Sequence, residues 1–132
     1  MTVAARQNAT QEIHYIRSNI AFNTVASGTQ VSMGAAVPAN AQILYTAVAV
    51  QTVFNAASTN VLIVGTAADP DALVAAGGAD ETAVGVTLVA PATLGGIMSS
   101  SADVELFWTC TQSGTAATTG AATVVVAYVP NA

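Results

Sequence analysis

The side chains that could carry out acid–base or nucleophilic chemistry are few in this protein. Its single histidine, His14, and its two arginines, Arg6 and Arg17, all lie at or before position 17, and the chain contains no lysine. General acid–base catalysis most often uses histidine, and phosphate binding uses arginine or lysine. Because the rest of the chain has none of these residues, the sequence argues against an enzyme, and we expect no cofactor.

The candidate nucleophiles lack neighbours that would activate them. The run Ser99-Ser100-Ser101 has no G-x-S-x-G spacing, so a serine hydrolase is not indicated. Cys110 is the one cysteine and can form no internal disulfide. No cation near Cys110 in the sequence would lower its thiol pKa, and His14 lies in a polar leader, so a cysteine–histidine pair is disfavoured. We expect Cys110 to be a small buried apolar side chain.

Six of the seven carboxylates lie beyond Arg17, in three short groups: Asp69 and Asp71, Asp80 and Glu81, Asp103 and Glu105. A calcium site at Asp69 and Asp71 is one alternative, but the spacing of an EF-hand loop is absent. Asp80 and Glu81 could add oxygens if the loop folded back, but the preferred interpretation is a helix cap and a solvated loop. Asp103 and Glu105 are two residues apart and are therefore expected on the same side of a strand. We interpret them as a solvent-facing strand edge rather than as the acid pair of a glycosidase.

The composition indicates a protein that functions by binding to other proteins. Only 7% of residues are charged, against roughly a quarter in ordinary soluble domains, while 53% are hydrophobic. Such a surface suits packing against other protein, and the alternative is a monomer kept soluble by hydroxyl groups and a net charge of −5. The acidic balance argues against nucleic-acid binding. No apolar run reaches membrane-spanning length, and the N-terminus lacks the apolar core of a secretory signal.

The elements that must position these residues are predicted to be strands. Residues 1–11 are polar and aperiodic and predict an extended N-terminal arm. Residues 12–132 predict one all-β domain, an antiparallel β-sandwich or jelly roll. The expected strands cover residues 12–23, 31–33, 42–54, 61–65, 82–89, 103–111 and 122–129, with a short buried piece at 97–98. Asp69 followed by Pro70 predicts the start of a helix of at most two turns.

Alternation along these strands predicts which side chains share a face. In the segment 103–111, Trp108 lies on the same side as Leu106 and Cys110, so we expect it to anchor the core. Two further faces are predicted: Leu44, Val48, Val50 and Phe54 in the long strand, and Val84, Val86 and Leu88 in the segment 82–89.

Arg6 and Arg17 are the exception to the lack of cations. Two positive charges on an extended leader, set against an acidic body, could reach a carboxylate on a neighbouring subunit or on a host surface. The alternative is a polar tail without a contact. We keep Arg6 and Arg17 as candidate interaction residues.

Two segments carry a resemblance to a known family. The run PANAQILYTAVAVQTVFNAASTNVLIVGTAADPDAL, residues 38–73, has a Pro-Ala turn, a long strand, an Asn-containing connector and a Val-Gly-Thr strand end. The closing run DVELFWTCTQSGTAATTGAATVVVAYVPN, residues 103–131, has the pattern of a final hairpin. Together these segments resemble the capsid cement (head decoration) proteins of tailed bacteriophages.

The resemblance implies a β-sandwich or jelly roll that binds the outside of an icosahedral phage head. Such proteins act as trimers or dimers over the joints between major capsid subunits, have no catalytic residues and are part of the virion. The implied partners are the major capsid protein and further copies of this chain. The alternative is another phage structural component, such as a head fibre, a tail part or a receptor-binding β-domain. A carbohydrate-binding or hydrolytic jelly roll is a third possibility, but it would need carboxylates and aromatic rings on one face.

Overall fold

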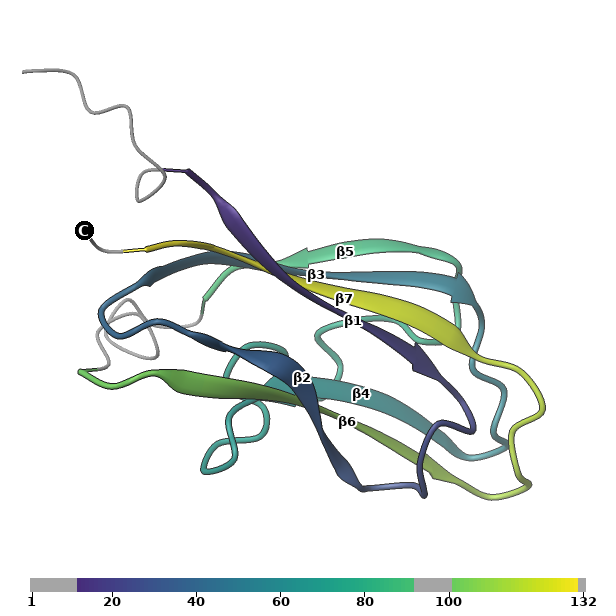
Figure 1. Cartoon of the computed structure of the whole chain (residues 1–132). Coiled ribbons are helices and arrows are strands. Elements are labelled where there is room, and N and C mark those ends of the chain that lie inside the picture. The colour runs from purple at the N-terminus through teal and green to yellow at the C-terminus, as the bar shows by residue number, and fades with distance from the viewer. Residues whose placement is uncertain (1–11, 92–100, 131–132) are drawn as a thin grey trace, which may run out of the picture.

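Two antiparallel sheets packed face to face make up the part of the chain that the computed structural model describes, residues 12–91 and 101–130. The larger sheet has the strand order β1-β7-β3-β5, and the smaller sheet has the order β2-β6-β4 (Figure 1). The strands are β1 (His14–Ala21), β2 (Gln30–Val37), β3 (Gln42–Thr52), β4 (Thr59–Gly65), β5 (Gly85–Val89), β6 (Val104–Ser113) and β7 (Ala121–Val129). The predicted all-β class and the β-sandwich are confirmed. The predicted arm, residues 1–11, and the predicted buried piece at 97–98 lie outside the described residues.

Strand pairing joins distant parts of the chain. β1 pairs with β7 and β2 pairs with β6, so the first strands of the sequence are held by the last ones. A jelly roll has eight strands, whereas the described residues form seven. Beside β4, the excursion (residues 66–84) makes a single bridge between Val64 and Val74 in place of a further strand. The jelly-roll part of the prediction therefore stays a prediction.

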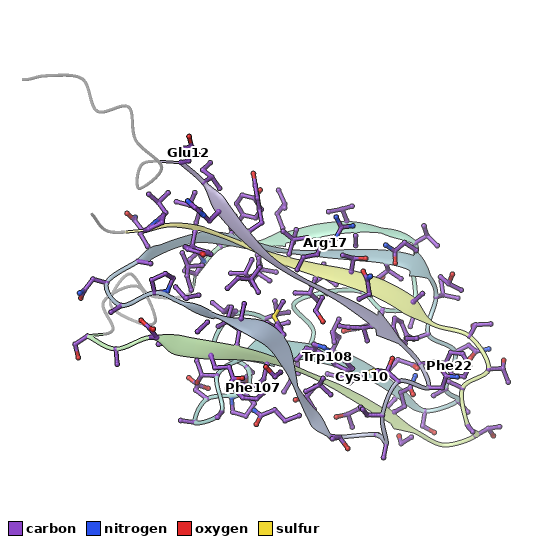
Figure 2. The ribbon with its side chains drawn as sticks, in the orientation of Figure 1. Glu12, Arg17, Phe22, Phe107, Trp108 and Cys110 are labelled. Atoms are coloured by element: carbon purple, nitrogen blue, oxygen red, sulfur yellow. The ribbon has the colours of Figure 1, made fainter. Side chains whose placement is uncertain are left out.

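The core between the sheets is built around β6 and β7. Trp108 is 1% exposed and lies on the inner side of β6 with Leu106 and Cys110, as alternation predicted (Figure 2). The indole Nε1 of Trp108 donates a hydrogen bond to Ser18 Oγ of β1 at 3.1 Å. Because β1 and β6 belong to different sheets, Trp108 joins the two layers by both packing and a hydrogen bond.

β3 contains an irregularity that simple alternation does not reveal. Its pairing with β7 shifts register between Ile43 and Tyr45. A shift of one residue exchanges the inner and outer sides of a strand. Ile43 is therefore buried and Leu44 is partly exposed. The predicted inner face of this strand is wrong at Leu44, and its later members are buried as predicted.

The excursion contains turns where a short helix was predicted. Residues 69–76 form no helix, and the Asp69 backbone makes a local turn in which Thr66 N donates to Asp69 O at 2.9 Å. Further along, Leu73 N donates to Val64 O at 2.9 Å, and Val64 N donates to Val74 O at 3.1 Å. Leu73 and Val74 are both buried against the core. A helix of two turns is unstable by itself, so docking of these two side chains onto β4 decides the local structure.

Candidate functional site

His14 and Cys110, which were considered for catalysis, lie on different strands, and each packs against neighbouring side chains. His14 belongs to β1, not to a leader as expected, and its ring stacks on Tyr128 with centroids 5.6 Å apart. Cys110 lies on β6 and is buried. Desolvation, helped by the nearby Glu81 carboxylate, raises the pKa of the Cys110 thiol to about 11. A thiol with that pKa is protonated at neutral pH and is a poor nucleophile. Ser99 and Ser100 lie outside the described residues.

Asp103 and Glu105 are exposed, as expected, and they hold neighbouring elements. Asp103 Oδ1 accepts a hydrogen bond from Ala39 N at 3.0 Å, and Glu105 Oε1 accepts one from Ser32 Oγ at 2.7 Å. β6 is the central strand of the smaller sheet, so their assignment to a strand edge is wrong. Both carboxylates attach β6 to the segment that includes β2 and its following turn.

Asp69 and Asp71 are exposed neighbours in the excursion. A hydrogen bond with the Asp71 side chain, together with desolvation and the Asp71 charge, raises the pKa of Asp69 above its ordinary value. Calcium takes six or more oxygen ligands. Within residues 12–91 and 101–130, no group of three or more His, Cys, Asp or Glu side chains is placed to hold a metal ion. The alternative of a calcium site therefore has no further ligands to support it there.

Glu81, which could have added an oxygen to a calcium site, is buried, whereas its neighbour Asp80 is not. Asp80 is exposed, and hydrogen bonds from Thr82 lower the pKa of its carboxyl group. Glu81, in contrast, is 5% exposed. Its Oε1 accepts a hydrogen bond from Leu62 N at 2.7 Å, and its backbone O accepts one from Phe54 N at 2.9 Å. Glu81 thus supplies an acceptor on the side of β4 that has no neighbouring strand, because a buried N–H group must be paired.

Replacing Glu81 with alanine should destabilise the fold by about 2 kcal/mol, because the buried N–H of Leu62 would lose its acceptor. Glu81→Gln retains an acceptor oxygen and should cost clearly less. Urea denaturation followed by circular dichroism measures both, and the amide of Leu62 should exchange faster with solvent in the alanine variant. Equal stability of the two variants would contradict this assignment.

The outer face of the larger sheet, called the broad face below, is apolar and nearly uncharged. Its outward residues are Tyr15, Arg17 and Asn19 of β1, Thr123, Val125 and Ala127 of β7, Tyr45, Ala47 and Ala49 of β3, and Val86 and Leu88 of β5. The four strands contain no Asp or Glu, and Arg17 is their one Lys or Arg residue. Of the six large hydrophobic side chains that are exposed among the described residues, five lie in or beside these strands: Ile13, Tyr15, Val84, Val86 and Leu88. They lie at the two edges of the sheet, beside or in β1 and β5, with β7 and β3 between them. Exposed apolar patches mark interaction surfaces.

The strand register arranges these side chains in rows across the sheet. Arg17 pairs with Val125, which pairs with Ala47, which pairs with Leu88. The next row runs through Asn19, Thr123, Ala49 and Val86. Directly paired residues on antiparallel strands point to the same side. Leu88 and Val86, 66% and 68% exposed, therefore project from the sheet beside the smaller side chains of Ala47 and Ala49.

Three polar side chains of the broad face are linked by hydrogen bonds. Gln51 Nε2 donates to Thr123 Oγ1 at 2.8 Å, and Thr123 Oγ1 donates to Asn19 Oδ1 at 3.0 Å, which links β3, β7 and β1. These three residues line a hollow of about 480 Å³. A protein that covered the broad face would leave this chain of hydrogen bonds intact, so its burial would carry a small desolvation cost.

Comparison with known proteins places this fold. No family model and no curated protein sequence matches the chain. A chain of the cyanophage Pam1 capsid asymmetric unit superposes with a TM-score of 0.73 at 15% identity, over 99% of this chain and 94% of that one. A chain of the Ralstonia phage GP4 capsid superposes with a TM-score of 0.64 at 18% identity, over 99% of this chain and 92% of that one. The fold is one found in phage capsids. The resemblance to phage virion proteins is thereby confirmed at the level of the fold.

Of the two arginines predicted to be interaction residues, the structure describes one. Arg6 lies outside the described residues. Arg17 lies within β1 and is exposed on the broad face (Figure 2). Its charge therefore lies on a strand of the larger sheet, within the broad face.

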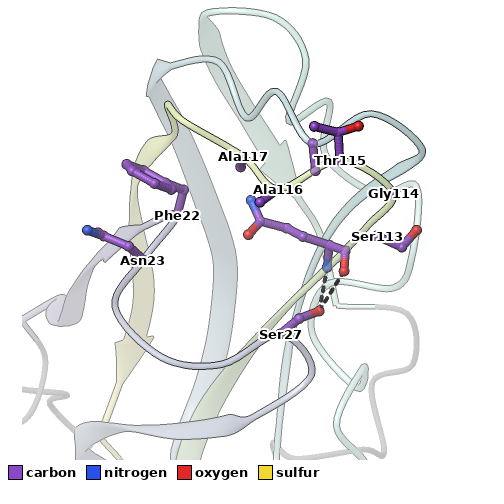
Figure 3. A pocket seen from close by; sticks show the side chains of 10 residues that line it. Phe22, Asn23, Ser27, Ser113, Gly114, Thr115, Ala116 and Ala117 are labelled. Atoms are coloured by element: carbon purple, nitrogen blue, oxygen red, sulfur yellow. Dashed lines mark hydrogen bonds between the residues drawn. The ribbon is translucent and has the colours of Figure 1, made fainter.

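A second hollow lies at one end of the sandwich, between the loop after β1 and the loop after β6 (Figure 3). It measures about 340 Å³ and is lined by Phe22, Asn23 and the small residues 113–117, among others. Ser27 Oγ donates to Gln112 O at 2.8 Å and accepts from Gln112 N at 2.7 Å, which closes one side. No charged side chain lines this hollow. Across the described ranges, no helix is long and apolar enough to cross a membrane.

Sequence reasoning grouped Val84, Val86 and Leu88 on one side of a strand but did not identify that side as an exposed surface. The signal available was the small size of the residues between them, Gly85 and Thr87. The inner side of β5 pairs Thr87 with the buried Val48, so the larger residues point outward.

Proposed function

We propose that this protein is a capsid cement (decoration) protein, which binds the outer surface of an icosahedral phage head and stabilises the joints between major capsid subunits. The observation that carries the proposal is the likeness of its whole fold to chains of two phage capsids, over 99% of its length in each case. The broad face adds an apolar surface whose four strands contain no carboxylate. A dimer or trimer of this chain on the head is part of the proposal.

The physical basis of such a function is adhesion. A cement protein needs contact area and complementary shape, repeated many times over the shell, and needs no reactive group. Standard protein interfaces bury about 1,600 Å² in total. A surface of Ala, Val and Thr can contribute to this area at small cost, because few charges have to leave water.

The proposal predicts that purified virions contain many copies of this protein on the outside of the head. Trypsin is unsuitable for detection because the chain has no Lys or Arg after Arg17, so elastase digestion or intact-mass measurement should be used. Antibody–gold labelling of intact particles should mark heads, with an internal head protein as the unlabelled control. Label on tails would favour the alternative of a tail or receptor-binding component, and absence from virions would refute both.

The N-terminal arm is proposed to add a second attachment. A chain that begins at residue 12 loses Arg6 and should occupy heads less completely than the full chain, because one tethered contact is removed. Its circular dichroism spectrum should be unchanged, since β1 begins at His14. Quantitative gels of repurified heads measure the occupancy. Equal occupancy of the two chains would show that residues 1–11 make no contact with the shell or with neighbouring copies.

A further inference from the structure

Resting on the proposed function, we infer that the broad face is the surface applied to the phage head, and that it contacts an apolar patch of shell protein that presents a carboxylate to Arg17. The inference names one face of the sandwich and the chemistry of the surface that covers it. It depends on three observations: the distribution of acids over the molecule, the position of Arg17 and the extent of the sheet.

Apart from Glu12, just before β1, the exposed acids of the described chain lie away from the broad face. Glu105 is on the outer side of the smaller sheet, with Asp103 just before it, and the excursion exposes Asp69, Asp71 and Asp80. Covering those surfaces would take carboxylates out of water, which is costly unless each finds a partner. The broad face has no carboxylate in its four strands, and Gln51, Thr123 and Asn19 on it are linked by hydrogen bonds. It is the side that can be buried at least cost.

Arg17 indicates that the covering surface differs from the broad face itself. If two copies met through this face, each Arg17 would enter an interface whose four strands contribute no carboxylate; Glu12 lies at the margin, before β1. A cation that leaves water without a charged partner is strongly destabilising. A partner that places one Asp or Glu opposite Arg17 removes this cost and fixes the register of the contact.

The area of the larger sheet is a substantial fraction of the area that each partner buries in a specific interface. Four strands about 4.8 Å apart make a face about 19 Å wide. The strands have 8, 9, 11 and 5 residues, so at about 3.3 Å per residue the face is on average about 27 Å long. The product, about 500 Å², compares with about 800 Å² per partner in a standard interface. Ile13 and Val84, exposed at the margins, extend the apolar area. The broad face can therefore be the main contact.

The test is a sedimentation assay in which purified protein is mixed with phage heads that lack it. Val86→Lys and Leu88→Lys place a charge on exposed positions of an edge strand, where lysine is well tolerated. Thr111→Lys on the exposed outer side of β6 is the matched control. We expect on the order of a hundredfold weaker binding for each β5 variant and unchanged binding for Thr111→Lys. Arg17→Glu, at an exposed position, should weaken binding at least tenfold. Circular dichroism establishes that each variant is folded.

The outcomes separate the inference from the proposed function. If the unmodified protein binds heads and the β5 and Arg17 variants do not, the inference is supported. If the unmodified protein and all four variants bind equally, or if Thr111→Lys alone fails, the inference is overturned while the proposed function stands. If light scattering shows that the β5 variants break an oligomer in solution, the broad face is a contact between copies and the inference is again overturned. Failure of the unmodified protein to bind overturns the proposed function itself.

Discussion

Replacing Trp108 with alanine is expected to lower the free energy of unfolding by about 3–5 kcal/mol. The side chain is 1% exposed and fills the space between the two sheets from the centre of the smaller one. Its removal would create a cavity among Leu106, Val124 and other buried side chains of the same core. It would also leave Ser18 Oγ without the indole donor that reaches it across the layers.

The measurement is urea denaturation followed by far-ultraviolet circular dichroism, because Trp108 is the one tryptophan and the variant has no tryptophan fluorescence. Trp108→Phe keeps an aromatic ring and should lose distinctly less stability. Ser18→Ala removes only the hydrogen-bond acceptor and should cost about 1 kcal/mol. A loss below about 1 kcal/mol for Trp108→Ala would mean that the ring does not support the core.

Gly65→Ala is expected to destabilise the protein by about 3 kcal/mol, at the upper end of the range for overpacked sites. A Cβ atom at this position would overlap the backbone oxygen of Asp69 and would lie 2.6 Å from Pro70 C and 2.7 Å from Ala72 N. Since all three are backbone atoms, no side-chain rotation relieves the overlap. The excursion would have to move away from β4, and the hydrogen bond from Thr66 N to Asp69 O would be strained or lost.

The matched control is Gly34→Ala, which tests loss of glycine without a steric overlap. Gly34 has a φ of +80°, and a Cβ atom added there would meet nothing within 4 Å, so its substitution should cost about 1–2 kcal/mol from backbone strain alone. Hydrogen exchange at the amides of Leu73 and Val74 should accelerate in Gly65→Ala and stay slow in Gly34→Ala. If the two variants lose equal stability with equal exchange, close packing of the excursion against Gly65 is not what requires glycine there.

Much of the fold could be predicted because strand alternation is a local property of the chain. The inner side of β6 with Trp108, the strand nature of β3 and β7 and the burial of Cys110 all follow from side chains two residues apart on a pleated backbone. The scarcity of cations can likewise be read from composition alone. These conclusions need no knowledge of which strands pair.

Other features depended on partners far away in the sequence. The register shift near Ile43 is set by β7, and the loss of the expected helix is set by docking of Leu73 and Val74 on β4. The burial of Glu81 could not be predicted from its neighbours in sequence, because the Leu62 N–H that donates to it lies on β4. The broad face could not be predicted for the same reason, because it is formed by four strands that are far apart in the sequence.

By itself, the sequence determined that this protein is an all-β molecule with almost no cations and with Val84, Val86 and Leu88 on one side of a strand. Only the tertiary structure decided that this side points outward, next to Arg17, on a sheet face without carboxylates. The physical reason is that alternation states which residues share a face, whereas the order of strands in two packed sheets states whether that face meets the core or water.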